Sequence, residues 1–193
     1  MNEYTTVNIL DMIDVIGEDK VVRVLSDFSC PKNQEIECFI RNNAINFAKR
    51  KMSVTHLVMN GDNKLVAIFT LAHKALEISN EGLSSAARRK IKRYAQLDES
   101  RNSYMISAFL VAQFGKNNPD SSDNISGNEL MDNVIEVLER VQRDVGGGVM
   151  YLECEDKPKL LTFYENERNR FRVFSERYSE TDQTKYIQLM RFF

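Results

Sequence analysis

The segment that most restricts the possible folds is SYMISAFLVAQF, residues Ser103–Phe114. It is long and apolar on both faces in its middle, which predicts a β-strand that is covered on both sides. Such a strand belongs near the centre of a sheet that has helices on both faces. The rest of the chain must therefore supply neighbouring strands and amphipathic helices that cover them.

Two segments have the periodicity of amphipathic helices. Asn33–Arg50 places apolar side chains on one face at Ile36, Phe39, Ile40, Ala44, Phe47 and Ala48. A second set recurs at the same spacing at Leu130, Val134, Val137, Leu138, Val141 and Val145. The first helix is therefore predicted over Asn33–Arg50 and the second over Ile125–Val145, where three glycines stop it.

The remaining elements are shorter and follow from local signals. Strand patterns occupy Tyr4–Ile9, Ser53–Met59, Leu65–Ile78, Val149–Cys154, Phe171–Phe174 and Tyr186–Phe193. Helix patterns occupy Met12–Ile16, which Asp11 is expected to cap, and Asp19–Leu25, Ser84–Tyr94 and Pro158–Tyr164. The turn at Asn60–Lys64 joins two of the strands as a hairpin. The order predicts one α/β domain over residues 1–193 with a mixed, largely antiparallel sheet.

Composition limits the classes of protein to which the chain can belong. Hydrophobic residues make up 42% of its 193 residues and charged residues 28%, the balance of an ordinary globular protein. The net charge of −2 argues against a protein that coats nucleic acid. No apolar run reaches the ~18 residues of a membrane span, and the polar, acidic start is unlike a secretory signal. We therefore expect a cytoplasmic protein that does not bind a membrane.

Cysteine and histidine are few and widely spaced. The three cysteines are Cys30, Cys38 and Cys154, and the two histidines are His56 and His73. Their spacing forms neither a disulfide framework nor a CxxC metal knuckle. We expect no metal site, and free, buried thiols that behave as small apolar side chains.

Two segments combine glycine with a helix end, but only one runs in the direction of a phosphate site. Gly146–Gly148 lead from a helix into a strand, so a helix stop explains them. The strand Ser103–Phe114, the polar loop Gly115–Asn124 and the helix from Ile125 run the other way. Backbone N–H groups at that helix start could face an anion, although any capped helix after a strand offers the same geometry.

The order of these elements resembles the GNAT superfamily of acyl-CoA-dependent N-acetyltransferases. The resemblance is closest to the branch that includes the acetyltransferase toxins of bacterial toxin–antitoxin pairs. It runs from about Phe28 to the C-terminus, through FSCPKNQEIECFIRNNA, THLVMNGDNKLVAIFTL, VAQFGKN, ISGNELMDNV and KLLTFYE. It implies a mostly antiparallel sheet with helices on both faces, in which Ser103–Phe114 and Val149–Cys154 are parallel strands that splay apart.

The resemblance also implies an activity and its residues. The activity is transfer of an acetyl group from acetyl-CoA to a primary amine by direct attack in a ternary complex, without a metal. Backbone groups would hold the pantetheine arm at Phe114, Gly115 and Lys116, and the pyrophosphate at Asn124, Ile125, Ser126, Gly127, Asn128 and Glu129. Tyr164 would protonate the departing thiolate.

The sequence departs from the family pattern at three places. In the loop pattern Gln/Arg-x-x-Gly-x-Gly/Ala only Gly127 matches, because Ser122 and Ile125 stand at the other positions. Lys157 replaces an Asn that often lies seven residues before the tyrosine. Asn169–Phe171 stand where a glycine and a bulky apolar residue usually follow the tyrosine helix. These departures leave open a second function, a GNAT-fold binding or regulatory module with weak or no catalysis.

The acceptor stays open at this stage. A small amine, a protein amine and the amino group of an aminoacyl-tRNA, as in the toxin branch, are the alternatives. The five cations within Arg88–Arg93 could contact tRNA phosphates, although a solvated helix face is the simpler interpretation. Glu77, His73 and Glu153 are candidates for the general base, and none is favoured. The toxin branch also implies an antitoxin partner, and the apolar final strand suggests a sheet edge that a second subunit could cover.

Overall fold

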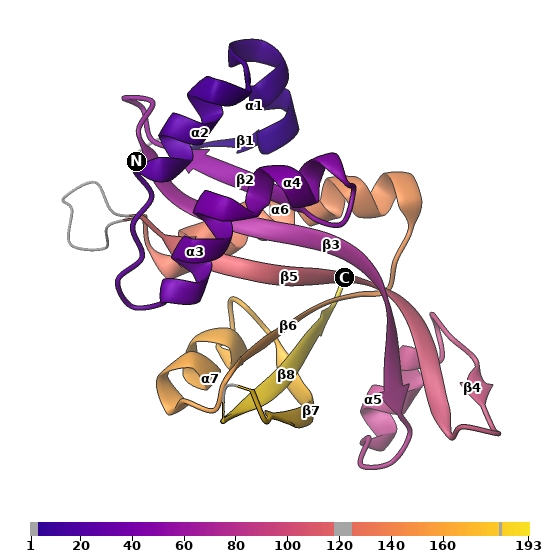
Figure 1. Ribbon diagram of the computed structural model, residues 1–193. Helices are drawn as coiled ribbons and strands as arrows, with labels where there is room; N and C mark the ends of the chain where they lie inside the picture. Colours follow the sequence, from indigo (N-terminus) through magenta and orange to yellow (C-terminus); the bar gives the residue numbers. More distant parts are fainter. Residues whose placement is uncertain (1–3, 118–124, 182) are drawn as a thin grey trace. The chain divides into compact units, whose positions relative to one another are not determined.

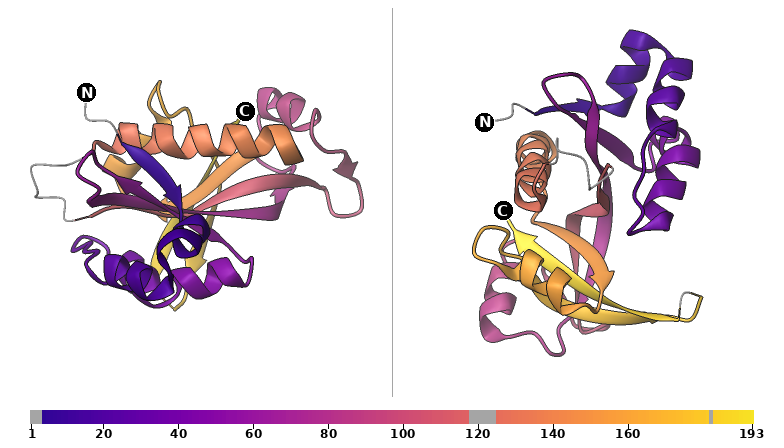
Figure 2. Two further views of the ribbon diagram at one scale, coloured as in Figure 1. Left: turned by 90° about the horizontal axis from the view of Figure 1, so that it is seen from above. Right: turned by 90° about the vertical axis from the view of Figure 1, so that its left-hand side faces the viewer.

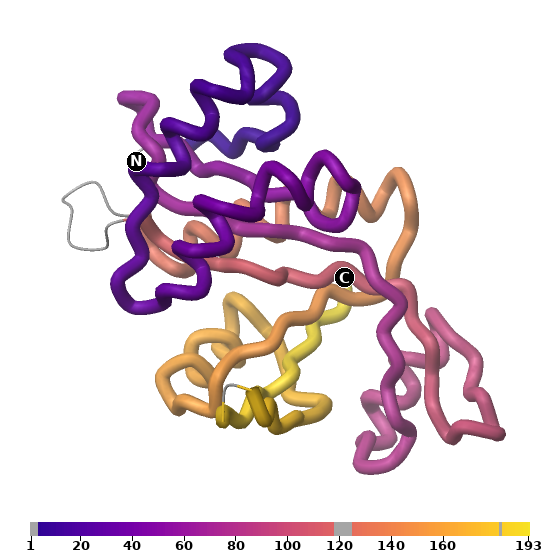
Figure 3. The backbone as a smooth tube through the Cα atoms, in the orientation of Figure 1, coloured from indigo at the N-terminus to yellow at the C-terminus, as the bar shows by residue number. Residues whose placement is uncertain are grey.

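The structure is a computed structural model that describes residues 4–117, 125–181 and 183–193. It is a mixed α/β protein built on a sheet with the strand order β1-β2-β3-β5-β6-β8-β7, and β4 pairs with β5 (Figures 1 and 3). The helices are α1 (Ile9–Ile16), α2 (Glu18–Ser26), α3 (Gln34–Asn42), α4 (Ala44–Lys49), α5 (Ser85–Ile91), α6 (Gly127–Val145) and α7 (Pro158–Glu165). The strands are β1 (Thr5–Asn8), β2 (Val54–Met59), β3 (Leu65–Ser79), β4 (Leu97–Asp98), β5 (Ser103–Lys116), β6 (Val149–Glu155), β7 (Arg172–Ser179) and β8 (Thr184–Phe192).

The sheet is mostly antiparallel, as the sequence predicts. Five of the described strand pairings are antiparallel. β5 and β6 are parallel, with Ala108–Leu110 opposite Val149–Tyr151, a register that covers three residues of each strand. β5 is flanked by β3 and β6 in the strand order, which confirms the central place expected for its apolar sequence.

The chain divides into two compact units. The N-terminal unit consists of Met1–Ala72 and Val111–Ile135, and the C-terminal unit of His73–Leu110 and Glu136–Phe193. Both units contain part of β3 and part of β5, because these two long strands pass from one unit into the other. Among the described residues, no helix is long and apolar enough to cross a membrane.

In the N-terminal unit, helices cover both faces of the strands. α1–α4 lie on one face and the first turns of α6 on the other (Figure 2). One core cluster joins Ile9, Val21, Leu25, Phe28, Ile36, Ile40, Leu57 and Ile68, all of them buried. On the α6 side, the Thr6 hydroxyl of β1 donates to the Asn133 side chain at 2.8 Å. The helices on two faces are those that the sequence predicts.

Two predicted helix boundaries in this unit are wrong. The first helix begins at Ile9, and its N-cap is Asn8, whose side chain accepts the Leu10 N–H at 2.9 Å, so Asp11 lies in the first turn instead of capping it. The predicted single helix over Asn33–Arg50 is two helices. They meet at Asn43, where φ is −121° and ψ is −27°, outside the helical range although the apolar periodicity continues.

The C-terminal unit has its own core. It joins Leu76, Ile78, Leu83, Ile91, Tyr104, Ile106, Val149, Tyr151 and Met190. β8 is an inner strand between β6 and β7, so its predicted position at a sheet edge is wrong, and β7 is the strand at that end. The apolar side chains of β8 that suggested an exposed edge are buried at Ile187, Leu189 and Met190. The short strand β4, which the sequence did not indicate, pairs with the start of β5.

Candidate functional site

The helix that follows β5 begins with a reciprocal pair of hydrogen bonds. The Ser126 hydroxyl accepts the Glu129 N–H at 3.2 Å, and the Glu129 carboxylate accepts the Ser126 N–H at 2.9 Å. This is a capping box, which fixes the first turn of α6 with Gly127 as its first residue. The start of a 19-residue helix carries a partial positive charge, so it attracts anions.

The end of β5, in the same unit, packs closely against the segment before α3. A Cβ atom on Gly115 would lie 3.2 Å from Cγ2 of Ile36, on α3, and 3.6 Å from Sγ of Cys30, so a side chain here would require Ile36 to shift by a few tenths of an ångström. Just beyond the end of β5, Asn117 forms hydrogen bonds with β3 and with the segment before α3. Its N–H donates to the Val66 carbonyl at 2.8 Å, and its side-chain oxygen accepts the Ser29 N–H at 2.7 Å.

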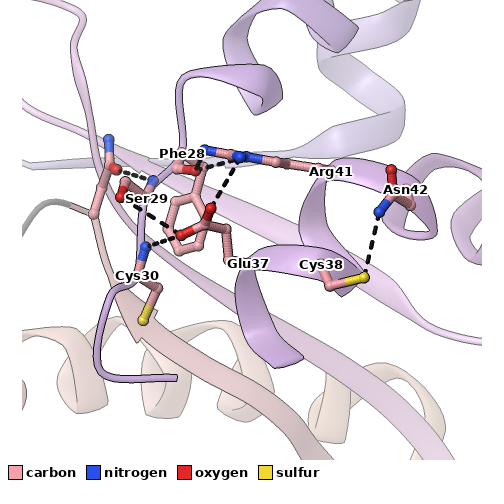
Figure 4. A network of polar contacts seen from close by, with 8 residues as sticks. Phe28, Ser29, Cys30, Glu37, Cys38, Arg41 and Asn42 are labelled. Carbon is pink, nitrogen blue, oxygen red and sulfur yellow. Dashed lines mark hydrogen bonds and ion pairs between the residues drawn. The ribbon is translucent and has the colours of Figure 1, made fainter. Parts of the chain in front are cut away.

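A polar network holds the segment before α3 in place (Figure 4). The Glu37 carboxylate accepts the Cys30 N–H at 2.8 Å and pairs with Arg41 at 2.9 Å. The Arg41 guanidinium in turn donates to the Phe28 carbonyl at 2.7 and 3.0 Å. Both charged side chains come from α3, so this helix fixes the backbone of residues 28–30 beside the end of β5.

The N-terminal unit therefore holds most of the predicted coenzyme residues at two places. The end of β5 carries Phe114, Gly115 and Lys116, and the start of α6 carries Ile125, Ser126, Gly127, Asn128 and Glu129. Asn124 and the loop position Ser122 lie outside the described residues. The predicted strand-to-helix direction is confirmed, and contact with a coenzyme stays a prediction.

Tyr164 lies on α7 in the C-terminal unit. Its side chain is buried, with 8% of the residue's surface exposed, and its ring lies edge-on to the rings of Phe163 and Phe171. Burial raises the pKa of the hydroxyl well above its usual value, and the nearby Cys154 raises it further. The hydroxyl is therefore neutral over the physiological pH range and can act as a hydrogen-bond donor.

Cys154 on β6 is the neighbour of Tyr164 that the sequence did not identify. It is a free, buried thiol, as predicted, and so is Cys30, whereas Cys38 is exposed and its predicted burial is wrong. Burial raises its pKa to about 11, and Asp156 and Glu155 contribute to the shift. The thiol is therefore protonated at neutral pH and unreactive as a nucleophile. It shapes the surroundings of Tyr164 as a small apolar group.

The turn after α7 explains one departure from the family pattern. Arg170 has a φ of 59°, in the left-handed region that favours glycine, and Phe171 is fully buried. Arg170 therefore has the backbone conformation of the usual glycine, and Phe171 is the bulky apolar residue. Between them and α7, the Asn169 side chain donates to the Phe163 carbonyl at 2.7 Å. The sequence could not show that an arginine adopts this conformation.

Lys157, the second departure, is the N-cap residue of α7. It makes no side-chain cap hydrogen bond, and its ammonium pairs with Glu155 at 2.5 Å. An asparagine at this position would accept a backbone N–H of the first turn. Pro158, the first helical residue, fixes the helix start instead, because its ring sets φ near the helical value.

The three candidates for a general base differ in their partners. His73 Nε2 lies 2.7 Å from the Ser107 hydroxyl, and its ring centre is 5.1 Å from that of Phe109. Glu77 accepts a hydrogen bond from Ser103 at 2.7 Å.

Glu153 is held in an ion pair. Burial raises the pKa of its carboxyl, but hydrogen bonds from Arg177 and Gln188 outweigh this and leave the pKa below its usual value. Glu153 is therefore a poor base, and the geometry favours none of the three. Among the described residues, no three His, Cys, Asp or Glu side chains gather as a metal site.

The chain is similar to solved structures of bacterial toxins along almost its whole length. A structure described as AtaT complexed with acetyl-methionyl-tRNAfMet has a TM-score of 0.65 and 15% identity, over 99% of this chain and 94% of that chain. A tyrosine-to-phenylalanine mutant of KacT has a TM-score of 0.67 and 14% identity, over 98% and 95%. AtaTR bound with AcCoA has a TM-score of 0.61 and 14% identity, over 98% and 93%.

Sequence comparison adds nothing to this, because no protein-family model matches the chain and no curated protein is similar to it at a significant level. The likeness is one of architecture, and it includes the mixed sheet, the parallel pair β5–β6 and helices on both faces of the N-terminal unit's strands. The chain has the fold of AtaT and KacT.

Proposed function

We propose that the protein is an N-acetyltransferase that moves the acetyl group of acetyl-CoA to a primary amine. The observation that carries this proposal is the start of α6, a capped 19-residue helix that follows the central strand in a GNAT fold. A helix start of this kind binds phosphate groups through its backbone N–H groups. The likeness to a structure with bound AcCoA supports the same ligand here.

The two places in the N-terminal unit would hold different parts of the coenzyme. Backbone groups of Phe114, Gly115 and Lys116 would bind the pantetheine arm, and those of 124–129 the pyrophosphate. The residues present fit this role, because Ser126 and Gly127 are small and leave the first turn of α6 accessible. The Glu129 carboxylate opposes it, since a negative charge lies within hydrogen-bond distance of the Ser126 N–H.

Tyr164 would assist departure of the thiolate. Attack by the amine nitrogen forms the C–N bond, and the C–S bond then breaks with the electron pair on sulfur. An alkyl thiol has a pKa of about 8.5, well below that of the Tyr164 hydroxyl, so complete proton transfer from the tyrosine is unfavourable. Tyr164 would instead donate a hydrogen bond that stabilises the developing thiolate, while the proton lost by the amine ends on sulfur or in solvent.

The acceptor that we propose is the amino group of an aminoacyl-tRNA. The solved complex of AtaT with acetyl-methionyl-tRNAfMet supports this choice, as do the cations of α5 and the residues that follow it. We also propose that the protein is cytoplasmic, that it has an antitoxin partner and that it forms a homodimer.

An assay with labelled acetyl-CoA tests the activity and the acceptor together. The protein is incubated with acetyl-CoA labelled in the acetyl group and with total tRNA, either aminoacylated or stripped of its amino acids. Acid-precipitable label with charged tRNA, and none with stripped tRNA, would support both. Parallel reactions offer spermidine or a protein mixture as the amine. Label transferred only to these would support the acetyltransferase activity and refute the tRNA acceptor. No transfer to any amine would leave only the second function below.

The second candidate function is a GNAT-fold binding module without catalysis. Two observations favour it, the Glu129 carboxylate at the start of α6 and the missing loop glycines. Retention of Tyr164 in a buried, neutral state argues against it. Coenzyme binding without turnover in the assay above would identify this module.

A further inference from the structure

The C-terminal unit contains a pocket of about 940 Å³ that is lined by none of the residues proposed for the coenzyme or for the chemical step. One wall is the loop before α5, the helix itself and the residues just after it, from Gly82 to Tyr94. The other wall is the turn at Arg170, the first half of β7 and the end of β8. In Figure 1, α5 is the magenta helix and β7 and β8 are the yellow strands. A pocket of this volume is large enough for a small-molecule ligand.

The pocket is strongly cationic. Its charged lining residues include five cations, at Lys90, Arg93, Arg170, Arg172 and Arg191. Among the lining residues, the acidic side chain is that of Glu176, which pairs with Lys185 at 2.7 Å. Basic side chains therefore outnumber acidic side chains in the lining, and a concave basic surface concentrates anions.

The three arginines on the β7–β8 side are held in position without losing their charge. Arg170, Arg172 and Arg191 each donate a hydrogen bond to a backbone carbonyl between residues 165 and 169, at distances of 2.9, 2.8 and 3.1 Å. A carbonyl oxygen is neutral, so these bonds orient the guanidinium groups without themselves neutralising the charge. Oriented guanidinium groups match the oxygens of a phosphate.

Aromatic rings line the pocket beside these cations. The ring of Phe192 stacks with Tyr94 at a centroid distance of 6.0 Å, and the Lys90 ammonium lies 5.5 Å from the same ring. Phe174 and Phe193 complete the aromatic part of the lining. Cations next to aromatic rings are the combination that binds phosphate groups and planar bases together.

We propose that this pocket binds a nucleotide, with Lys90 and Arg93 among the groups that contact its phosphates and the aromatic rings packing against its base. The same chemistry is present in a free nucleoside triphosphate and in a single-stranded RNA, and the experiment distinguishes these two sources. No residue placed at the coenzyme or at Tyr164 lines the pocket. Lys90 and Arg93 are also among the cations that support the proposed tRNA acceptor, so the RNA measurement bears on that acceptor as well, whereas the ATP measurement does not.

α5 and the turn after it provide a matched control for the test. Of the five cations in this region, Lys90 and Arg93 line the pocket, whereas Arg89 and Lys92 do not. All four side chains are exposed. Lys90→Ala/Arg93→Ala and Arg89→Ala/Lys92→Ala therefore remove the same charge from the same segment, and only the first pair removes it from the pocket.

The experiment measures binding of ATP by calorimetry and of a fluorescein-labelled ten-nucleotide single-stranded RNA by anisotropy, at several salt concentrations. Inorganic tripolyphosphate serves as an anion without a base. We expect the Lys90→Ala/Arg93→Ala protein to bind at least one of the two nucleotide probes about tenfold more weakly than the wild type. The control pair should change affinity by less than about twofold. If the RNA is the ligand, its salt slope should fall by about 1.4 in the pocket variant, at roughly 0.7 per lost contact.

Each outcome bears on the proposal. Binding of ATP that depends on the pocket identifies a free nucleotide as the source, and binding of the RNA alone identifies a nucleic acid. Equal losses in the two variants would show a diffuse electrostatic effect and overturn the proposal. Tripolyphosphate that binds as tightly as ATP would also overturn the proposal. The absence of binding of either nucleotide probe to the wild type would overturn it too.

Discussion

Ser126 and Glu129 cap the start of α6 through each other's backbone, at 3.2 and 2.9 Å. The pair stabilises the helix start that the proposed function requires for the coenzyme pyrophosphate. It also places the Glu129 carboxylate at the helix start, where the negatively charged pyrophosphate would bind. The same residue therefore supports the fold and opposes the ligand, and substitution can separate the two effects.

Glu129→Gln should strengthen acetyl-CoA binding. The amide oxygen can still accept the Ser126 N–H, whereas the charge that repels the pyrophosphate is lost. A charge near a helix start contributes about 1 kcal/mol, so we expect the KM for acetyl-CoA to fall about fivefold. Glu129→Ala removes the cap as well, and should lower the unfolding free energy by about 1 kcal/mol. An unchanged KM in both variants would place the pyrophosphate elsewhere.

Gly127→Glu should weaken acetyl-CoA binding with little effect on the fold. The substitution adds a side chain and a carboxylate at the first residue of α6, where the backbone must approach the pyrophosphate. We expect the coenzyme-dependent rise in melting temperature to shrink or disappear, because it reports binding to the native state. Val141→Glu adds the same charge at an exposed position further along the helix and should leave the rise intact.

The fold could be predicted where one physical signal dominated. The apolar faces of β5, α3 and α6 and the hairpin β2–β3 specify their own structures, and their order is enough to indicate the sheet. The break at Asn43 was missed because apolar periodicity continues across it. The inner position of β8 was missed because an apolar strand at an edge and one between two strands have the same sequence.

The site was predictable only in part, for a related reason. The start of α6 could be identified as a candidate phosphate site, because the order of strand, loop and helix is visible in the sequence. The neighbourhood of Cys154 and Tyr164 depends on tertiary packing of β6 against α7, which no local pattern encodes. The cationic pocket likewise joins α5 to residues about 80 and 100 positions later, so only Lys90 and Arg93 belonged to a visible cluster.

Arg170→Gly should stabilise the protein. Arg170 has a φ of 59°, which is unfavourable for a side chain and free of strain for glycine. The relief should exceed the backbone entropy that glycine loses on folding, for a net gain of about 0.5–1 kcal/mol in the free energy of unfolding by urea. Arg168→Gly is the control, since Arg168 is not among the described residues with a positive φ, and it should lower the stability. A loss in both variants would contradict the strain argument.

Stability should fall with rising pH in the range where Cys154 ionises. Its pKa is raised from 9.0 to about 11 in the folded protein, so the folded state holds the proton more tightly than the unfolded state. The stabilisation is complete below pH 9 and is lost as the pH rises to about 11, by up to roughly 3 kcal/mol. Cys154→Ser cannot ionise in this range, so its stability should depend less steeply on pH between 9 and 11. Parallel curves for the two proteins would show that the thiol does not contribute.

Tyr164→Phe tests the proposed role in the chemical step. The substitution keeps the ring contacts with Phe163 and Phe171 and deletes the hydroxyl. Because a thiolate is already a fairly good leaving group, we expect kcat to fall by about 10²-fold, the lower end of what one hydrogen-bond donor to a developing negative charge contributes. The KM for acetyl-CoA should change little, since the interaction is made in the transition state.

The matched control for this variant is Tyr151→Phe, which removes the hydroxyl of another tyrosine that is 9% exposed, on β6. Its turnover should stay within about twofold of the wild type, because loss of a hydroxyl outside the site affects stability rather than the transition state. Single-turnover measurement separates the chemical step from product release, which can limit kcat and conceal the effect.

The pH dependence of the rate gives a further check on Tyr164. The raised pKa of Tyr164 keeps the hydroxyl protonated, so its ionisation should cause no loss of rate up to about pH 10. A Tyr164→Phe protein with the single-turnover rate of the wild type would remove this residue from the mechanism.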